Sequence, residues 1–360
     1  MTQFKSILIG HDTIECAYYL RTQGGSGLDF ARLSALKEGM RNSKYAEAIP
    51  LKIGGEEFLF QPYGTKSGYP FVLKNHDYSI QCGEFNNPSF FVTYRSEGLW
   101  QYGALALQQK FLAWANGLGL YPFKAESLSR VDFTFDYWLP VIDFDEECVV
   151  SLSAKDNKHR KNGRIQTITY GSGGDVVLRI YNKVAEIEEK SLSKTWFFDL
   201  WGIAENVWRI EWQTRKDILR RFSIRTLDDL LAGQGDILRY LAHEHDTLRI
   251  KTDDSNRSRW PLHPLWQDLH QQIAKLEYQG VYREIDQTAV LSQRQMRIAV
   301  SVYGNLKRVA AIHGLQHGDD AVSLREALER IEQLISRVHD PMTWQPDVQK
   351  RMTQMRLGQW

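Results

Sequence analysis

Two short segments of the chain repeat one pattern, and each predicts a β-strand with an acid on one face. Residues 129–137 read Ser-Arg-Val-Asp-Phe-Thr-Phe-Asp-Tyr, and residues 208–214 read Trp-Arg-Ile-Glu-Trp-Gln-Thr. Successive side chains of a strand point to opposite faces of its sheet, so Asp132 and Glu211 face away from the large apolar residues beside them. The pattern therefore predicts a sheet with one apolar face and one face that presents carboxylates.

A third segment adds a tyrosine and two cations. Residues 178–183 read Leu-Arg-Ile-Tyr-Asn-Lys, and on a strand Arg179, Tyr181 and Lys183 share one face. Carboxylate oxygens bind hard divalent cations such as Mg²⁺ or Mn²⁺, and a tyrosine beside such an ion can attack phosphorus. The three segments together contain what is needed to break a phosphodiester covalently.

Some alternatives within these segments stay open. Asp136 shares the face of Asp132 but lies about 13 Å further along a strand, so it can join the metal ligands only if the strand bends or ends. Each acid could instead pair with a neighbouring arginine, Arg130 or Arg209, as buried acids usually do. Tyr170 is a second candidate nucleophile.

The order of these motifs resembles the Rep_trans replication initiators of rolling-circle plasmids, filamentous phages and some integrative conjugative elements. The resemblance covers about residues 10–250, and residues 92–103 also look like the family. Its motifs are Arg-Val-Asp-x-x-x-Asp, then Thr-Tyr-Gly-Ser at residues 169–172, then Arg-Ile-Tyr-Asn-Lys-x-x-Glu, then Trp-Arg-Ile-Glu-Trp.

The resemblance implies a metal-dependent DNA nickase, or relaxase, that cuts one strand and stays attached through a phosphotyrosine. It implies Tyr181 as the nucleophile and a carboxylate-based metal site, for which Asp132 and Glu211 are the candidates and Asp136 a third. Lys183 and Arg179 would then neutralise the charge that develops on the phosphate. The implied partners are a replication or transfer origin in DNA, a host helicase and a second copy of the chain.

Composition is compatible with this function. The net charge is only +1, so a surface for nucleic acid has to come from local clustering of Lys and Arg. The three cysteines are widely spaced, which argues against disulfides or a zinc site and favours a reducing cytoplasm. The sequence has no apolar run long enough for a membrane span, so no membrane partner is expected.

Two basic clusters are candidates for DNA contacts. The first is a predicted hairpin, for which a solvated loop is the alternative, and its cations are Lys155, Lys158, Arg160, Lys161 and Arg164. The second follows Glu211 on a helix-like stretch and contains Arg215, Lys216, Arg220, Arg221 and Arg225. His243 and His245 superficially look like a metal-binding pair, but on a helix they would point about 200° apart and would not converge.

The predicted fold is α+β, with antiparallel sheets and packed helices in two related halves, one acidic strand in each, plus a small helical C-terminal domain. Helices are predicted over residues 102–117, 226–243, 293–313 and 323–339, the last with an apolar stripe that is typical of a core. A polar linker at residues 249–259 would separate a catalytic and DNA-binding domain, residues 1–250, from the helical domain, residues 260–345.

Two other functions compete with origin nicking. A catalytically silent protein could use the same fold and the basic hairpin for sequence-specific DNA binding. A phosphoesterase could instead activate water with the metal and need no covalent step. Metal-dependent cleavage would distinguish an enzyme from the silent DNA-binding protein. The phosphoesterase, unlike the nickase, would tolerate the loss of Tyr181.

Overall fold

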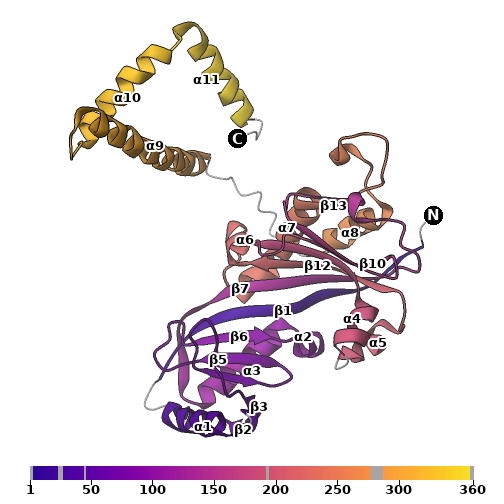
Figure 1. The fold of residues 1–360 in the computed structure, drawn as a ribbon. Coiled ribbons are helices and arrows are strands. Elements are labelled where there is room, and N and C mark those ends of the chain that lie inside the picture. The colour runs from indigo at the N-terminus through magenta and orange to yellow at the C-terminus, as the bar shows by residue number, and fades with distance from the viewer. Residues whose placement is uncertain (1–2, 23–26, 44–45, 192–193, 277–286, 357–360) are drawn as a thin grey trace. The chain divides into compact units, whose positions relative to one another are not determined.

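The computed structural model describes residues 3–22, 27–43, 46–191, 194–276 and 287–356. The chain divides into two compact units, Met1–Val281 and Tyr282–Trp360. The first unit is built on an antiparallel sheet of eleven strands in the order β2-β3-β4-β5-β6-β1-β7-β12-β11-β10-β9 (Figure 1).

The first half of this sheet begins with the long strand β1 (Lys5–Thr22). Its other strands are β2 (Ile49–Ile53), β3 (Glu56–Phe60), β4 (Phe71–Lys74), β5 (Tyr78–Cys82) and β6 (Phe90–Tyr94). Its helices are α1 (Phe30–Asn42), α2 (Ser96–Tyr102) and α3 (Ala104–Gly117). The returning strand β6 pairs with β1, so the half closes beside its own first strand.

The second half repeats this plan around the long strand β7 (Leu120–Trp138). Its other strands in this sheet are β9 (Asp156–Lys161), β10 (Arg164–Tyr170), β11 (Val176–Asn182) and β12 (Val207–Arg215). Its helices are α4 (Lys183–Lys190), α5 (Trp196–Trp201), α6 (Lys216–Arg221) and α7 (Leu227–Tyr240). The returning strand β12 pairs with β7, and β1 and β7 pair at the centre.

The predicted fold class is confirmed, with one correction. Two related halves lie side by side in one sheet, but both acidic strands, β7 and β12, belong to the second half. The repeated triplets are therefore neighbours within one half, and the expectation of one acidic strand in each half is wrong. The helix predicted over residues 226–243 is α7, which begins at Thr226 with a complete capping box.

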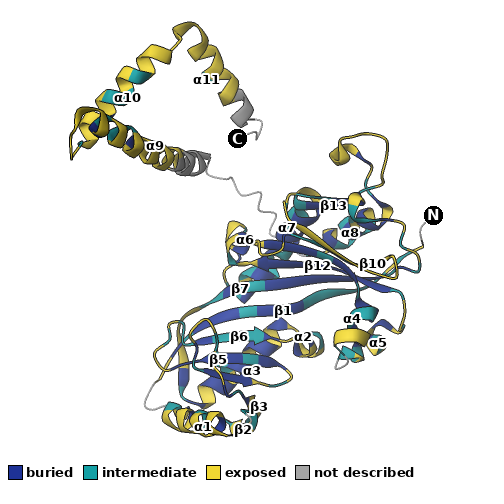
Figure 2. Ribbon diagram, in the orientation of Figure 1, coloured by how far each residue is buried: buried dark blue, intermediate teal, exposed yellow. Residues whose placement is uncertain are grey.

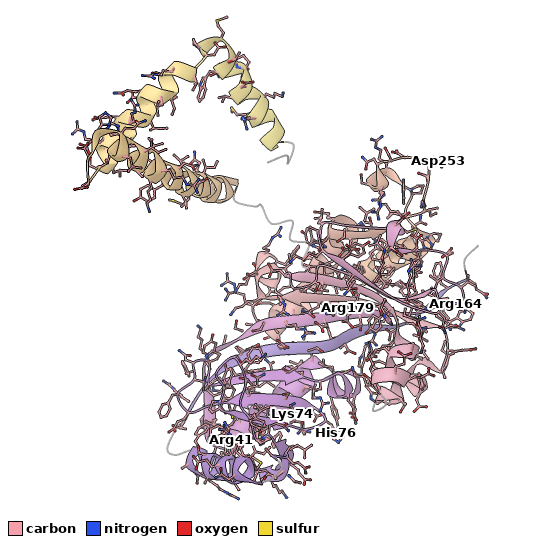
Figure 3. The ribbon with its side chains drawn as sticks, viewed as in Figure 1. Arg41, Lys74, His76, Arg164, Arg179 and Asp253 are labelled. Atoms are coloured by element: carbon pink, nitrogen blue, oxygen red, sulfur yellow. The ribbon has the colours of Figure 1, made fainter. Side chains whose placement is uncertain are left out.

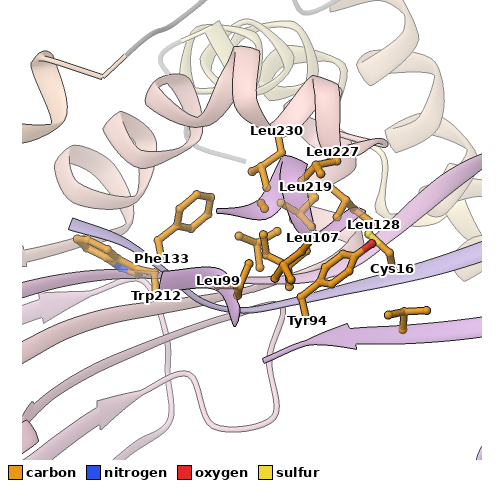
Figure 4. Close-up of a cluster of buried hydrophobic side chains, with 14 of the residues drawn as sticks. Cys16, Tyr94, Leu99, Leu107, Leu128, Phe133, Trp212, Leu219, Leu227 and Leu230 are labelled. Atoms are coloured by element: carbon orange, nitrogen blue, oxygen red, sulfur yellow. The ribbon is translucent and has the colours of Figure 1, made fainter. Parts of the chain in front are cut away.

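One face of the sheet holds the main core, as the alternation in the sequence predicts. Phe133 of β7 and Trp212 of β12 belong to the same buried cluster as Leu227 and Leu230 of α7 (Figure 4). Figure 2 shows that the central strands of the sheet are largely buried. Burying one such side chain contributes about 1.5–3 kcal/mol, so this face stabilises the fold while the other face stays free for polar groups.

Part of the opposite face is covered by a smaller apolar cluster at one end of the sheet. The cluster contains Val184, Ile187, Phe197, Trp201 and Val207, and Trp100 of α2 packs against it. A Cβ on Gly10 would lie 2.6 Å from Trp100, so only glycine lets α2 approach β1 this closely. The helices α2, α4 and α5 thus cap one end of the face that carries the predicted carboxylates.

The segment predicted as a linker packs against the first unit. Residues 249 and 262 form an isolated β-bridge, and α8 (Pro264–Ala274) follows. Trp266 of α8 is fully buried and meets Trp212 edge to face with ring centroids 5.6 Å apart. A two-stranded sheet of β8 (Val149–Ser151) and β13 (Asp246–Leu248) lies in the same unit. The chain therefore divides at residues 281 and 282, beyond the predicted linker.

The second unit is helical, as predicted. It contains α9 (Gln287–His317), α10 (Leu324–Val338) and α11 (Pro341–Arg356). The apolar stripe of α10 is largely exposed, since Leu328 is 49% and Val338 80% accessible, so among the described residues it does not form the expected core. No described helix of either unit is long and apolar enough to cross a membrane.

Candidate active site

The strands β7, β12 and β11 bring the predicted carboxylates and the tyrosine to one face. Asp132 stands opposite Gln213, and Glu211 opposite both Thr134 and Arg179. Asp132 and Glu211 are therefore diagonal neighbours on adjacent strands, a relation that separates backbones by about 7–8 Å and side-chain Cβ atoms by somewhat less. Both acids therefore lie on the carboxylate-presenting face that the alternation predicts, on two strands that are neighbours in the sheet.

Asp132 is a buried carboxylate beside an arginine. Its Oδ1 and Oδ2 accept hydrogen bonds from Arg130 Nε and Nη2 at 2.8 and 2.5 Å. Burial and, to a smaller extent, the charge of Glu211 raise the pKa of Asp132 to about 7, against the lowering effect of Arg130. The effect of the Glu211 charge on the pKa of Asp132 fits the shared face of the two residues.

Glu211 links the tyrosine to an arginine. Tyr181 Oη donates to Glu211 Oε2 at 2.9 Å, and Arg179 Nη1 donates to Oε1 at 2.8 Å. Burial, and then the charge of Glu211, raise the pKa of Tyr181 well above its usual value, so the phenol is protonated. The Tyr181 hydroxyl is thus held by a hydrogen bond to a carboxylate that can orient it and accept its proton.

Asp136 has a different environment, which sequence reasoning missed. Arg209 Nε and Nη2 donate to its two oxygens at 2.6 and 2.9 Å, and Trp201 Nε1 donates to Oδ2 at 2.9 Å. Arg209 Nη1 also donates to Asp12 Oδ1 at 2.6 Å. Asp136 and Arg209 are fully buried. This buried triad joins β1 of the first half to β7 and β12 of the second, and it was not foreseeable from spacing because Asp12 and Arg209 are 197 residues apart.

Lys183 begins α4, whereas the sequence pattern places it on the strand. Asn182 caps this helix by accepting a hydrogen bond from Ala185 N at 3.0 Å. Lys183 Nζ nevertheless lies 5.5 Å from the Tyr181 ring centroid and 2.7 Å from Glu186 Oε2. Burial lowers the pKa of Lys183, which weakens its hold on a proton.

The donor set fits a divalent cation that needs few protein ligands. Mg²⁺ is commonly held by one or two carboxylates together with substrate phosphates and water, and Asp132 and Glu211 supply two. Within the described residues no group of three His, Cys, Asp or Glu has metal-binding geometry. Both oxygens of Asp136 already accept from Arg209, so Asp136 is the least available of the three acids.

The second candidate nucleophile, Tyr170, does not lie on the face that carries Asp132 and Glu211. Tyr170 stands opposite Leu178, a core residue, and so points to the apolar face; its hydroxyl donates to the Glu146 carbonyl at 2.8 Å.

His243 stacks on His270 with ring centroids 3.5 Å apart, whereas His245 Nδ1 lies 2.9 Å from Asp246 Oδ2. The two histidines therefore have separate partners.

The basic hairpin forms as predicted, with both turn residues, Asn162 and Gly163, at positive φ. All its cations are exposed. Lys158 and Arg160 both bind Glu146, and their contacts, with Lys158 the largest cause, lower the pKa of Glu146 to about 2. Lys161 pairs with Glu189. Arg164, at the hairpin end in Figure 3, and Lys155 lie outside these pairs.

The second basic cluster lies at the end of β12 and on α6. Arg215, Arg220, Arg221 and Arg225 are exposed, and Arg221 also lies 5.6 Å from the Tyr240 ring centroid. Lys216 is half-buried. These cations are on the surface, where they could meet a phosphate backbone.

Comparison with known proteins finds one family match over part of the chain and one similar solved structure. Residues 101–233 match a family of phage replication-associated proteins, in the part described as N-terminal. A solved structure of the rolling circle replication initiator protein from Geobacillus stearothermophilus is 18% identical, with a TM-score of 0.43, over 76% of this chain and 98% of that chain. No curated protein matches the chain. The family match spans Asp132, Tyr181 and Glu211, and it supports the resemblance of this part of the chain to replication initiators.

Proposed function

We propose that the protein nicks and rejoins one DNA strand at a replication or transfer origin, with Tyr181 as the nucleophile. The family resemblance supports a role in replication initiation. The observation that carries the finer proposal is the hydrogen bond from Tyr181 Oη to Glu211, a carboxylate one diagonal away from Asp132. A tyrosine held against one of two acids on a polar sheet face suits covalent phosphoryl transfer.

The reaction is a transesterification. Tyr181 Oη attacks phosphorus, its proton passes to Glu211 Oε2, and the bond from phosphorus to one bridging oxygen breaks. The leaving oxygen takes one proton from solvent and becomes a sugar hydroxyl, and Glu211 returns the proton of Tyr181 to solvent, so protons balance and no water is consumed. Rejoining reverses the steps, with a sugar hydroxyl attacking the phosphotyrosine.

Asp132 and Glu211 would hold Mg²⁺ or Mn²⁺. Such a cation supplies Lewis acidity that makes phosphorus more electrophilic. The arginines now bound to these acids, Arg130 and Arg179, would have to release some of their hydrogen bonds to admit it. Arg179 would then be free to turn to the phosphate.

Positive charge near Tyr181 supports phenolate formation. Arg209 stands directly opposite Tyr181 in the β11–β12 ladder, and its charge lowers the pKa of Tyr181, against the larger raising effect of burial. Lys183 lies over the same ring. We assign Arg179 and Lys183 to the phosphate charge and Arg209 to the tyrosine.

The proposal is tested with supercoiled plasmid that carries the cognate origin. The wild-type protein should relax it in the presence of Mg²⁺ or Mn²⁺ and not in excess chelator. It should also retain one DNA strand through denaturing electrophoresis. Nicking without any adduct would indicate hydrolysis by activated water and would contradict the tyrosine mechanism.

A silent DNA-binding protein is the second candidate function. The observation in its favour is that both carboxylates are ion-paired with arginines, which is also how structural acids are held in a sheet. Such a protein would bind its origin tightly and leave it intact with every divalent ion tested.

A further inference from the structure

The face that carries the candidate site continues along β1 and β7, away from the end that α2, α4 and α5 cap. Beyond Asp132 the cross-strand pairs on this face are Glu15–Arg130, Ala17–Ser127, Tyr19–Lys124 and Arg21–Tyr121. Tyr18 and Leu20 alternate with these residues and are buried in the core on the helix-covered face. The ladder therefore leads from the site to an open end of the same face.

This open end carries aromatic rings and cations in alternation, and we name Tyr19, Arg21, Tyr121, Phe123 and Lys124 the distal strip. Lys124 Nζ lies 4.5 Å from the Tyr19 ring centroid, and the Tyr19 and Phe123 centroids are 6.2 Å apart. Arg21 Cζ lies 5.7 Å from the Phe123 centroid. The strip is thus one continuous surface with two cations and no carboxylate.

The rings of the strip are available to a partner. Phe123 is 50% and Tyr121 37% exposed, and Arg21 and Lys124 are exposed as well. The register shifts between Tyr19 and Leu20, where Lys124 and Pro122 are the partners, so Phe123 has no cross-strand partner of its own. Such a bulge re-aims a side chain, and here it brings Phe123 beside Tyr19.

Unpaired DNA bases match this chemistry better than a duplex does. Exposed rings stack on bases that have lost their neighbours, while Arg and Lys contact the phosphates. A duplex keeps its bases stacked inside, so it could use only the two cations. From Tyr121 to Asp132 the strand spans 11 residues at about 3.3 Å each, or roughly 35 Å, which accommodates several nucleotides.

We propose that the distal strip binds a single-stranded segment of DNA, with bases stacked on Phe123 and Tyr121 and phosphates held by Arg21 and Lys124. The inference rests on the proposed function in one respect, that the bound strand leads along the sheet face to Tyr181. It assigns a partner to a surface some distance from the carboxylates.

The test measures binding of a fluorescent single-stranded oligonucleotide to the full chain by anisotropy, in chelator so that no cleavage occurs. Because stacking contributes about 1–3 kcal/mol per base, Phe123→Ala with Tyr121→Ala should weaken single-strand binding tenfold or more, and duplex binding little. Arg21→Gln with Lys124→Gln should reduce the log-log salt slope by about 0.7 for each lost contact.

The chain offers a matched control. Tyr63 is 58% exposed and lies 5.9 Å from Arg41 Cζ, so Tyr63→Ala removes a comparable ring beside a comparable cation outside the strip. Its single-strand affinity should equal that of the wild type. If the strip variants behave like Tyr63→Ala, or lose single-strand and duplex affinity equally, the proposal is overturned.

A photo-cross-link places the strand directly. An oligonucleotide with 5-iodouracil should attach to the peptide that contains Tyr121 and Phe123, and attachment confined to other peptides would contradict the proposal. Both measurements work without cleavage, so failure of nicking leaves them interpretable. A protein that nicks normally while its strip variants keep full single-strand affinity would refute this inference alone.

Discussion

The two halves of the sheet share one topology but differ on the polar face, which lies opposite the face that holds the main core. On the polar face the β1–β6 ladder pairs Glu15 with Thr93 and Ala17 with Phe91. The β7–β12 ladder instead pairs Asp132 with Gln213, Thr134 with Glu211 and Asp136 with Arg209. The apolar face therefore has the same plan in both halves, whereas the polar face carries the proposed site in the second half.

The halves are nevertheless joined through the buried triad. Arg209→Met would leave Asp136 buried without its cation and Asp12 with Lys194 alone, and breaking a buried pair in this way costs about 3–5 kcal/mol. Urea unfolding should show this loss, and Arg325→Met, at an 89% exposed surface pair, should change stability by less than about 1 kcal/mol. Equal effects of the two substitutions would mean that the triad does not hold the halves together.

The difference in chemistry between the halves predicts unequal effects on nicking. Asp132→Asn or Glu211→Gln should lower the nicking rate by more than about a hundredfold, since even outer partners of metal ligands cost 10–100-fold. Thr93→Val, on the same face of the first half, should leave the rate nearly unchanged. The measurement is the initial rate on origin plasmid across a range of Mg²⁺ concentrations. A comparable loss in Thr93→Val would remove the distinction between the halves.

The raised pKa of Asp132 predicts a pH dependence of stability. An acid whose folded pKa is about 7 and whose unfolded pKa is near 4 binds more protons in the folded state, so the free energy of unfolding falls as pH rises through this window. Asp132→Asn cannot ionise and should escape this loss. Without divalent ions, its melting temperature relative to wild type should therefore increase from pH 4 to pH 7, and parallel profiles would contradict the assignment.

The basic hairpin should contribute less, through origin binding, and its individual cations should contribute unequally to that binding. Neutralising Lys158, Arg160, Lys161 and Arg164 together should weaken origin binding and reduce the log-log salt slope by up to about 0.9 per lost phosphate contact. Glu146 already neutralises Lys158 and Arg160, so Lys155→Gln with Arg164→Gln should have more effect than Lys158→Gln with Arg160→Gln. An unchanged slope in every variant would show a merely solvated hairpin.

The sequence predicted what depends on local periodicity. Alternation in residues 129–137 and 208–214 was sufficient for the two strands and their faces, and the helical pattern that starts at residue 226 was sufficient for the start of α7. Asn182 was a readable signal that was missed: as an N-cap it ends β11 and puts Lys183 on a helix. Polar composition at residues 249–259 was misleading because a linker and a packed surface loop have similar composition, and here Trp260 is buried.

Contacts between segments that are far apart in the sequence could not be predicted. The acids at 132 and 211 were matched to arginines by proximity in sequence, and this worked for Asp132 and Arg130. It did not work for Glu211, whose arginine is Arg179 on the next strand, or for Arg209, which binds Asp12 and Asp136. Such pairings follow from strand order and register, which a single sequence does not reveal.

The central claim, that the chemistry belongs to Tyr181 on the polar face of the second half, is tested most directly by mapping the DNA adduct. The wild type is trapped with origin DNA and Mg²⁺, digested, and the nucleotide-bearing peptide is identified by mass spectrometry. Tyr181→Phe should abolish the adduct with folding and origin binding nearly intact, and Tyr170→Phe, on the other face, should leave it unchanged. The account predicts a nucleotide on Tyr181; a nucleotide on Tyr170 or any other residue, or a normal adduct in Tyr181→Phe, would contradict it.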